Sequence, residues 1–289
     1  TSGASPALGS GQPLAPTTRL VPPPDRYRVD ASDLGIWWAQ EIQKQIDDMA
    51  VHGIKFAGLM VDSIFSSDGV LPGPQGFLKP ALDVVHANGG IFIADEVQPG
   101  FARTGESFWG FGRHGIVPDV VTLGKPMGNG IPVSGLLAKA DVLAAFSDDI
   151  PYFNTFGGNP VSMAAAQAVL QVIREEKLQE HSLRVGELLR NELALLADRH
   201  PNVGDVRGAG LFTGFELVSN RESKTPDKAL ALDVIERLRA ERVLTSVAGP
   251  YGNVLKLRPP MAFQTEDIDW LVGSLNKVLM ACTANKRQS

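Results

Sequence analysis

The chain has 289 residues, of which 44% are hydrophobic and 20% are charged, and its formal net charge is −5. This composition is typical of a soluble globular protein with one large core or two domains. In the absence of a long basic run, we expect neither nucleic acid nor a membrane as partner. No apolar stretch has membrane-spanning length, and no signal peptide pattern is present. The single cysteine, Cys282, excludes an internal disulfide and a Cys-rich metal site, which suits a cytoplasmic protein.

Residues 1–28 form the first distinct segment. They are rich in Gly, Ser, Pro and Thr and do not begin with Met. Such a composition predicts an irregular lead-in without a core of its own. We therefore expect that the chain is either part of a longer polypeptide or a truncated form.

Helical and strand patterns alternate over the next part of the chain. Apolar residues at helical spacing predict helices over 33–52 and 73–90. Short apolar runs predict strands at 56–65, 91–95, 118–125 and 133–139. Helices that alternate with fully apolar strands indicate an α/β domain with a mostly parallel sheet.

The second part of the chain has a different pattern. A long helical pattern covers residues 160–200, and strands are predicted at 211–218 and 253–260. Helices are predicted between these strands and over residues 265–282, where Thr265 is an N-cap candidate. These elements indicate a smaller α+β domain. We predict a large domain over 29–185 and a small domain over 186–289.

Two acidic residues follow the strand "IFIAD". Ligands of parallel α/β sheets gather at the carboxyl ends of the strands, so Asp95 is placed to contact a ligand. The alternative, equally probable from the residues alone, is that Asp95 caps the following turn. Glu96 points to the opposite side, where a structural ion pair is expected, with Arg103 as candidate partner.

Lys125 follows an apolar run, within "GKPMGNGIP" (124–132). Pro126 disfavours a helical conformation of the residue before it and predicts an extended Lys125. A lysine between apolar and glycine-rich neighbours fits poorly as a solvated surface charge. A partly desolvated lysine has a lowered pKa and can act as an amine nucleophile.

Two further residues are candidates for binding anions. Thr155 lies beside a Gly-Gly turn before Pro160, where a hydroxyl and backbone amides can hold a phosphate. Arg258 ends an alternating strand and is suited to bidentate pairing with a carboxylate. Taken alone, a residue like Thr155 more often belongs to a helix-entry turn that binds no ligand. An arginine like Arg258 is more often a surface charge.

Four motifs together resemble one known family. They are "IADEVQPGFARTG" (93–105), "PDVVTLGKPMGNGIP" (118–132), "NTFGGNPVSMAAA" (154–166) and "LKLRPPM" (255–261). In this order they resemble the class III (subgroup II) aminotransferases, which are pyridoxal-phosphate enzymes of fold type I. The similarity is greatest to the alanine–glyoxylate aminotransferase 2-like branch, which also contains phospho-lyases acting on phosphoethanolamine. The resemblance implies a large domain that is incomplete at the N-terminus, because an N-terminal portion of the family is missing.

The resemblance also implies roles around pyridoxal 5′-phosphate. Asp95 would pair with the pyridine nitrogen, Val97 would pack on the ring, and Gln98 would donate a hydrogen bond to the phenolic oxygen. Lys125 would form the Schiff base and then move the proton between the substrate and the cofactor. No metal is implied.

Two implied roles concern the partner subunit and the substrate. Thr155 would reach the cofactor phosphate of the neighbouring subunit, which makes the active unit a homodimer. Arg258 would take the α-carboxylate of the substrate.

Three functions follow as expectations. The first is transfer of an amino group from an amino acid or ω-amine to a 2-oxo acid such as pyruvate or glyoxylate. The second is phospho-lyase activity on an amino phosphate such as phosphoethanolamine. Phospho-lyases of the branch often carry Lys at the position of Arg258, which favours amino transfer. The third is a truncated, non-catalytic fragment.

Overall fold

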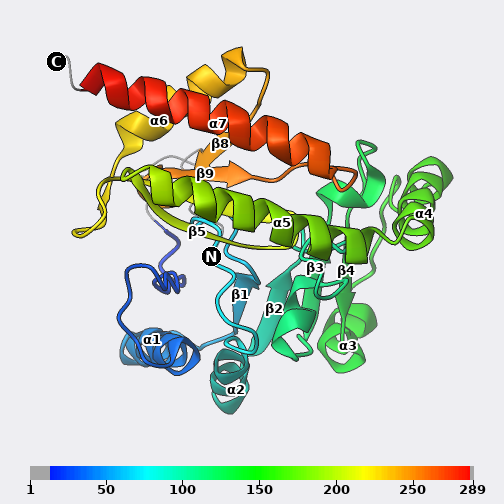
Figure 1. Ribbon diagram of the computed structural model, residues 1–289. Coiled ribbons are helices and arrows are strands. Elements are labelled where there is room, and N and C mark those ends of the chain that lie inside the picture. The colour runs from blue at the N-terminus through cyan, green and yellow to red at the C-terminus, as the bar shows by residue number, and fades with distance from the viewer. Residues whose placement is uncertain (1–13, 287–289) are drawn as a thin grey trace.

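The chain folds around two β-sheets, and α5 (Leu178–Arg199) runs across the molecule between the first sheet and the last helix (Figure 1). The computed structural model describes residues 14–286. None of the helices in this range is long and apolar enough to cross a membrane.

The first sheet carries the predicted site residues. Its strands, in sheet order, are β1 (Gly58–Asp62), β2 (Ile91–Asp95), β3 (Val120–Leu123) and β4 (Gly135–Ala138). β1, β2 and β3 run parallel, and β4 is antiparallel to β3. This confirms the predicted α/β class with a mostly parallel sheet. The carboxyl ends of β1 and β2 coincide, because Asp62 pairs with Asp95.

Helices and short helical turns connect these strands. They are α1 (Leu34–Val51), α2 (Lys79–Ala87), the 3₁₀ turns η3 (Gly110–His114) and η4 (Lys125–Gly128), α3 (Ala140–Asp149) and α4 (Pro160–Glu175). α1 begins where the Asp33 side chain accepts a hydrogen bond from the Ile36 amide at 3.0 Å. Its buried face, with Trp38 and Ile42, belongs to the core that includes Phe92 of β2.

The second sheet is antiparallel. It contains β5 (Val203–Ala209), β6 (Phe212–Asn220), β9 (Val254–Leu257) and β8 (Ser246–Ala248) in that order, and β7 (Thr225–Pro226) pairs with β6. α5, α6 (Lys228–Ala240) and α7 (Thr265–Lys286) cover it. Leu189, Phe215, Val234 and Leu275 are all buried in the shared core.

Three local predictions need correction. The long helix predicted over 160–200 is interrupted at Lys177, which has a left-handed φ of 51°. The helix predicted over 73–90 begins only at Lys79. β5 had no predicted counterpart, because Gly204 and Gly208 weaken its strand pattern. The predicted domain boundary after residue 185 lies inside α5, and the division into two domains stays a prediction.

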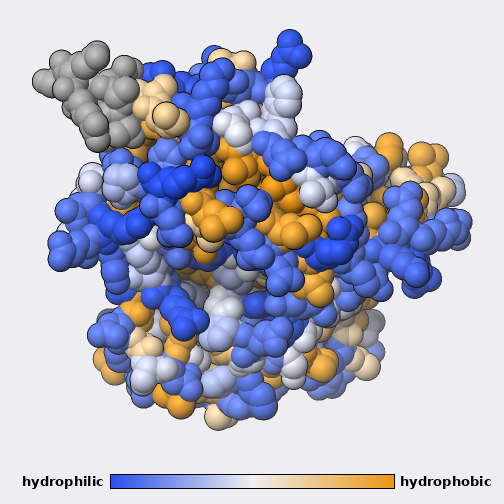
Figure 2. Space-filling view, in the orientation of Figure 1, coloured by the Kyte–Doolittle hydropathy of each residue, from blue (hydrophilic) through white to orange (hydrophobic). Residues whose placement is uncertain are grey.

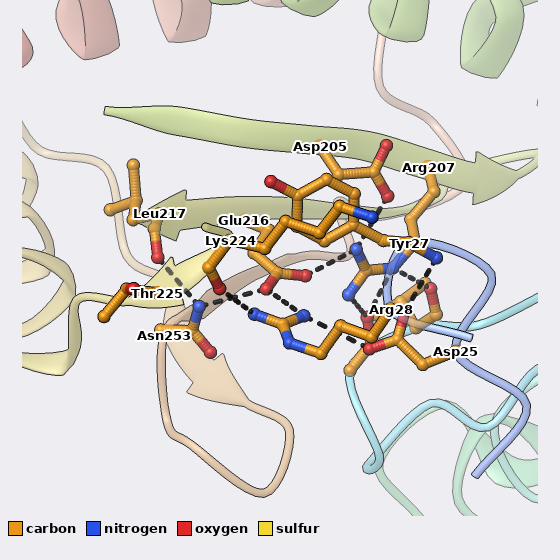
Figure 3. Close-up of polar contacts among 12 residues, drawn as sticks. Asp25, Tyr27, Arg28, Asp205, Arg207, Glu216, Leu217, Lys224, Thr225 and Asn253 are labelled. Atoms are coloured by element: carbon orange, nitrogen blue, oxygen red, sulfur yellow. Dashed lines mark hydrogen bonds and ion pairs between the residues drawn. The ribbon is translucent and has the colours of Figure 1, made fainter. Parts of the chain in front are cut away.

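The segment before α1 is held against the second sheet (Figure 3). Arg28 forms an ion pair with buried Glu216 of β6, Nη1 to Oε1 at 2.5 Å. Arg207 of β5 pairs with the second oxygen of Glu216 at 2.6 Å. Arg207 also donates from Nε to the carbonyl of Val70 at 2.9 Å, in the loop after β1. The network thus ties this segment, the second sheet and the edge of the first sheet together.

Candidate active site

Two aspartates end adjacent strands, but their environments differ. Asp62 of β1 is buried, and its carboxylate accepts from the amides of Ile64 and Ser66, each at 3.0 Å, and from the Ser66 hydroxyl. Burial raises the pKa of Asp62 to about 6, and the nearby charge of Asp95 adds to the rise. Both oxygens of Asp62 are used within the chain, which indicates a structural role.

Asp95 of β2 keeps one oxygen available. Its Oδ1 accepts from the Val97 amide at 3.1 Å and from the Thr122 hydroxyl of β3 at 3.3 Å. Within residues 14–286, no hydrogen bond or ion pair engages Oδ2. A carboxylate that is fixed through one oxygen and open through the other fits a protonated ring nitrogen as partner.

Lys125 follows the next strand, β3, and begins η4. The extended conformation predicted for it is wrong, because its φ is 35°. Pro126 instead occupies the first turn of η4, a position that its fixed φ favours. The Lys125 side chain is exposed, and its amine makes no hydrogen bond or ion pair with another described residue. A positive φ at a lysine is uncommon and marks a backbone held by its surroundings.

Val97 lies next to the backbone that leads to Lys125. A Cβ atom at Gly124 would stand 3.7 Å from a methyl group of Val97. The turn after Asp95 and the turn that carries Lys125 are therefore in contact. An apolar side chain therefore lies beside the turn that carries Lys125, where it can pack against a planar ring.

Gln98 connects the first sheet to the second. Its amide nitrogen donates to the hydroxyl of Ser66, which in turn donates to Asp62. Its oxygen accepts from Lys256 Nζ at 2.9 Å and from Arg258 Nη1 at 3.0 Å. The predicted residues Gln98 and Arg258 are thus brought together.

Lys256 is a site residue that the sequence analysis missed. It lies on β9, two positions before Arg258, which directly follows the strand, and both side chains reach the same Gln98 oxygen. Burial lowers the pKa of Lys256 to about 8, the positive charges of Arg258 and Lys125 lower it further, and Asp62 opposes them. The available signal was its place in "LKLRPPM", in alternation with Arg258.

The predicted ion pair between Glu96 and Arg103 is wrong. The buried Glu96 carboxylate accepts from the amides of Gly110 and Phe111, at 2.6 and 2.9 Å, and from the hydroxyl of Ser63 at 3.0 Å. Burial raises the pKa of Glu96 to about 7 despite these bonds. Glu96 therefore anchors the start of η3.

Arg103 points toward the second sheet instead. It donates to the carbonyl oxygens of Pro259, at 2.5 Å, and Leu211, at 3.3 Å. Burial lowers its pKa to about 10, and the nearby charge of Arg258 acts in the same direction. Arg103 thus adds a third cation to the surroundings of Gln98.

Thr155 stays apart from the other predicted residues. It lies in the exposed loop 151–158, in which the Asn154 side chain accepts from the amides of Phe156 and Gly157 at 3.2 and 2.9 Å. Asn159 then caps α4 by accepting from the Ser162 amide at 3.0 Å. No contact within the described part of the chain joins Thr155 to Lys125 or Asp95.

Comparison with known proteins identifies the family. The model of the family described as "Aminotransferase class-III" matches residues 5–279. An alanine–glyoxylate aminotransferase 2-like protein of Drosophila melanogaster is 41% identical over 259 residues, covering 89% of this chain and 52% of that protein. The mitochondrial alanine–glyoxylate aminotransferase 2 homolog 2 of Arabidopsis thaliana is 42% identical over 256 residues, covering 88% and 52%.

A solved structure has the same fold. The phospholyase from Arthrobacter in complex with phosphoethanolamine matches with a TM-score of 0.89 at 38% identity, covering 94% of this chain and 65% of that one. The chain spans about half the length of the curated relatives named above. Its fold is that of the fold type I pyridoxal-phosphate enzymes, and the chain belongs to the class III aminotransferase family.

Proposed function

We propose that the protein is a pyridoxal-phosphate-dependent aminotransferase. It moves an amino group from an amino acid or ω-amine to a 2-oxo acid such as pyruvate or glyoxylate. The main support for the proposal is that two polar groups, one after each of two neighbouring strands, are open to a ligand. The Lys125 amine and one oxygen of Asp95 have no partner within residues 14–286, and the turns that bear them are in contact.

The proposed roles follow from these positions. When bound, pyridoxal phosphate supplies a ring that takes up the electrons of the substrate Cα–H bond. Asp95 would hold the proton on the ring nitrogen, and Val97 would pack on the ring face. Lys125 would hold the cofactor through its amine, and that amine, once free, would serve as the acid/base that moves the proton of the substrate Cα. Gln98 would form a hydrogen bond to the phenolic oxygen of the cofactor, and Arg258 would bind the α-carboxylate of the substrate.

The proposed active unit is a homodimer, in which Thr155 binds the phosphate of the cofactor held by the neighbouring subunit. Apolar side chains around Thr155 support this proposal, because Tyr152, Phe153 and Phe156 are 70%, 85% and 80% exposed. Other apolar side chains gather along the middle and the right edge of the face in Figure 2, where Figure 1 shows α5 and α4. Leu195 of α5 and Val161 of α4 are 58% and 71% exposed.

The predicted cytoplasmic location also stays a proposal, since the Arabidopsis relative is named as mitochondrial. Fractionation of cells that express the full protein tests it.

A phospho-lyase is the second candidate function. It is favoured by the similarity to the Arthrobacter phospholyase, whose structure contains phosphoethanolamine. Removal of the same Cα proton, followed by loss of phosphate from the β-carbon and hydrolysis, yields phosphate, ammonia and an aldehyde. The third candidate is a fragment without catalytic activity.

One experiment separates these functions. The protein is incubated with pyridoxal phosphate, a panel of amino donors and either pyruvate or glyoxylate, with Lys125→Ala as control. Amino transfer forms alanine or glycine in amounts that depend on the 2-oxo acid. Phospho-lyase activity releases ammonia and phosphate without a 2-oxo acid. The fragment hypothesis predicts no product by either route.

A further inference from the structure

A relay of two hydrogen bonds leads from the end of β1 to the Gln98 side chain. Asp62 accepts a hydrogen bond from the Ser66 hydroxyl, and this hydroxyl accepts one from the Gln98 amide nitrogen. Asp62 is only 4% exposed and Ser66 is fully buried, so water does not compete for these bonds. The relay therefore connects the candidate site to the interior of the protein.

The chemistry of the partners fixes the direction of each bond in the relay. An ionised carboxylate only accepts, so the hydrogen of the Ser66 hydroxyl goes to Asp62. The hydroxyl oxygen is then left to accept from Gln98, which must present its NH₂ end. Lys256 and Arg258 only donate, so they require the oxygen end of the same amide, at 2.9 and 3.0 Å. A reversed amide would place its NH₂ group against two cations.

The orientation of the Gln98 amide decides what it offers to a ligand. The two ends of an amide side chain are nearly equal in size, so packing alone does not determine which end faces Ser66. Hydrogen bonds must do so. The amide nitrogen carries two hydrogens, and within residues 14–286 only the one bonded to Ser66 has an acceptor. The second hydrogen is available to a ligand.

We propose that Asp62 and Ser66 are positioning residues that hold the NH₂ end of Gln98 in place to donate to the cofactor. The proposal deepens the proposed function and rests on it, because it takes the phenolic oxygen of pyridoxal phosphate as the acceptor of the second hydrogen. A hydrogen bond to this oxygen favours its charged form and so lowers the pKa of the cofactor bound to Lys125. Loss of the relay should therefore raise that pKa, which is visible in the absorbance spectrum.

Two serine variants separate the relay from ordinary structural support. Ser66→Ala removes the hydroxyl and keeps the backbone amide of residue 66, which donates to Asp62 at 3.0 Å. Ser63→Ala is the matched control, because Ser63 is equally buried and its hydroxyl donates to the buried Glu96 carboxylate at 3.0 Å. Ser63 makes no bond to Gln98 in the described part of the chain. Both variants lose a buried hydroxyl-to-carboxylate bond, and only Ser66→Ala breaks the relay.

The first readout is the pH at which the absorbance of the cofactor-loaded protein changes. We expect Ser66→Ala to raise this pH by roughly 0.4–1 unit, the equivalent of one ordinary hydrogen bond, and Ser63→Ala to leave it unchanged. In a Gln98→Ala background, Ser66→Ala should cause no further shift, because the relay acts through Gln98. All variants keep the charged side chains around the site, which are Asp62, Asp95, Lys256 and Arg258. Equal shifts in the two serine variants, no shift in Ser66→Ala, or a full further shift in the Gln98→Ala background would each overturn the proposal.

A second readout separates this proposal from the proposed function. If no absorbance band depends on Lys125, the proposed function fails, and the relay is tested in the cofactor-free protein. NMR then follows the side-chain NH₂ signals of Gln98, which are assigned through their loss in Gln98→Ala. Ser66→Ala should shift these signals and speed their hydrogen exchange, whereas Ser63→Ala should leave them unchanged. Unchanged Gln98 signals in Ser66→Ala would reject the relay.

Discussion

Asp62 and Asp95 are paired across two parallel strands, yet they are held in opposite ways. Asp62 is buried with both oxygens engaged, whereas Asp95 is fixed through Oδ1 and open through Oδ2. Both residues end a strand at the same edge of the sheet, so their position does not show which carboxylate can bind a ligand. Their hydrogen bonds do, because only Asp95 keeps an oxygen open.

Asn substitutions at these two positions should have different consequences. Asp95→Asn removes the charge that keeps the ring nitrogen protonated, and we expect at least a tenfold loss of turnover with nearly unchanged stability. Asp62→Asn places an amide NH₂ against backbone donors and should lower the free energy of unfolding by about 1–3 kcal/mol. Urea unfolding and steady-state kinetics on both variants measure this contrast. Equal loss of stability in the two variants would show that Asp95 is structural.

Glu96 should make the stability of the protein depend on pH. Its pKa is raised to about 7 in the folded state, so the unfolded chain loses this proton first as the pH rises. Its contribution to stability is therefore fully present below about pH 4.5 and is lost as the pH rises to about 7. Asp62 acts in the same direction up to about pH 6, whereas buried His114, with its pKa lowered to about 3, acts in the opposite direction.

The variant Glu96→Gln isolates this contribution, because Asp62 and His114 remain in place. The difference in unfolding free energy between the parent and Glu96→Gln should change between pH 5 and pH 7, with the parent losing stability relative to the variant. Urea unfolding at several pH values measures it. A difference that is constant over this range would mean that Glu96 titrates normally.

The first sheet was largely predictable because its signals are local. The run 91–95 is apolar and ends in acids, and the glycines and prolines around Lys125 enforce a turn. β5 was not predictable in this way, because it is held by pairing with β6 rather than by its own pattern. The helical pattern is interrupted at Lys177, where no neighbouring glycine or proline indicates the end of a helix.

The site was predictable only in part. Asp95 and Lys125 stand at strand ends, which the apolar runs reveal. The contacts of Gln98 with Lys256 and Arg258 span about 160 positions and depend on how the two sheets pack. We predicted an ion pair for Glu96 because a buried carboxylate is often paired with a cation. In the structure, backbone amides donate hydrogen bonds to this carboxylate instead.

The ion pair between Arg28 and Glu216 should stabilise the whole chain. Arg28→Met leaves the buried Glu216 with Arg207 as its only cationic partner in the described range and should lower the free energy of unfolding by roughly 2–4 kcal/mol. Arg26→Met, in the same segment, removes an exposed arginine and should change it by less than about 0.5 kcal/mol. Thermal and urea unfolding compare the two variants, and equal stabilities would show that the ion pair contributes nothing.

The most direct test of the proposed chemistry is to locate the cofactor on the chain. The purified protein is mixed with pyridoxal phosphate, its absorbance spectrum is recorded, and borohydride reduction followed by peptide mass spectrometry identifies the modified lysine. We expect one cofactor per chain, attached to Lys125, and no stable attachment in Lys125→Ala. Attachment to Lys256 or to another lysine in the parent, or unchanged labelling in the variant, would contradict the assignment of Lys125.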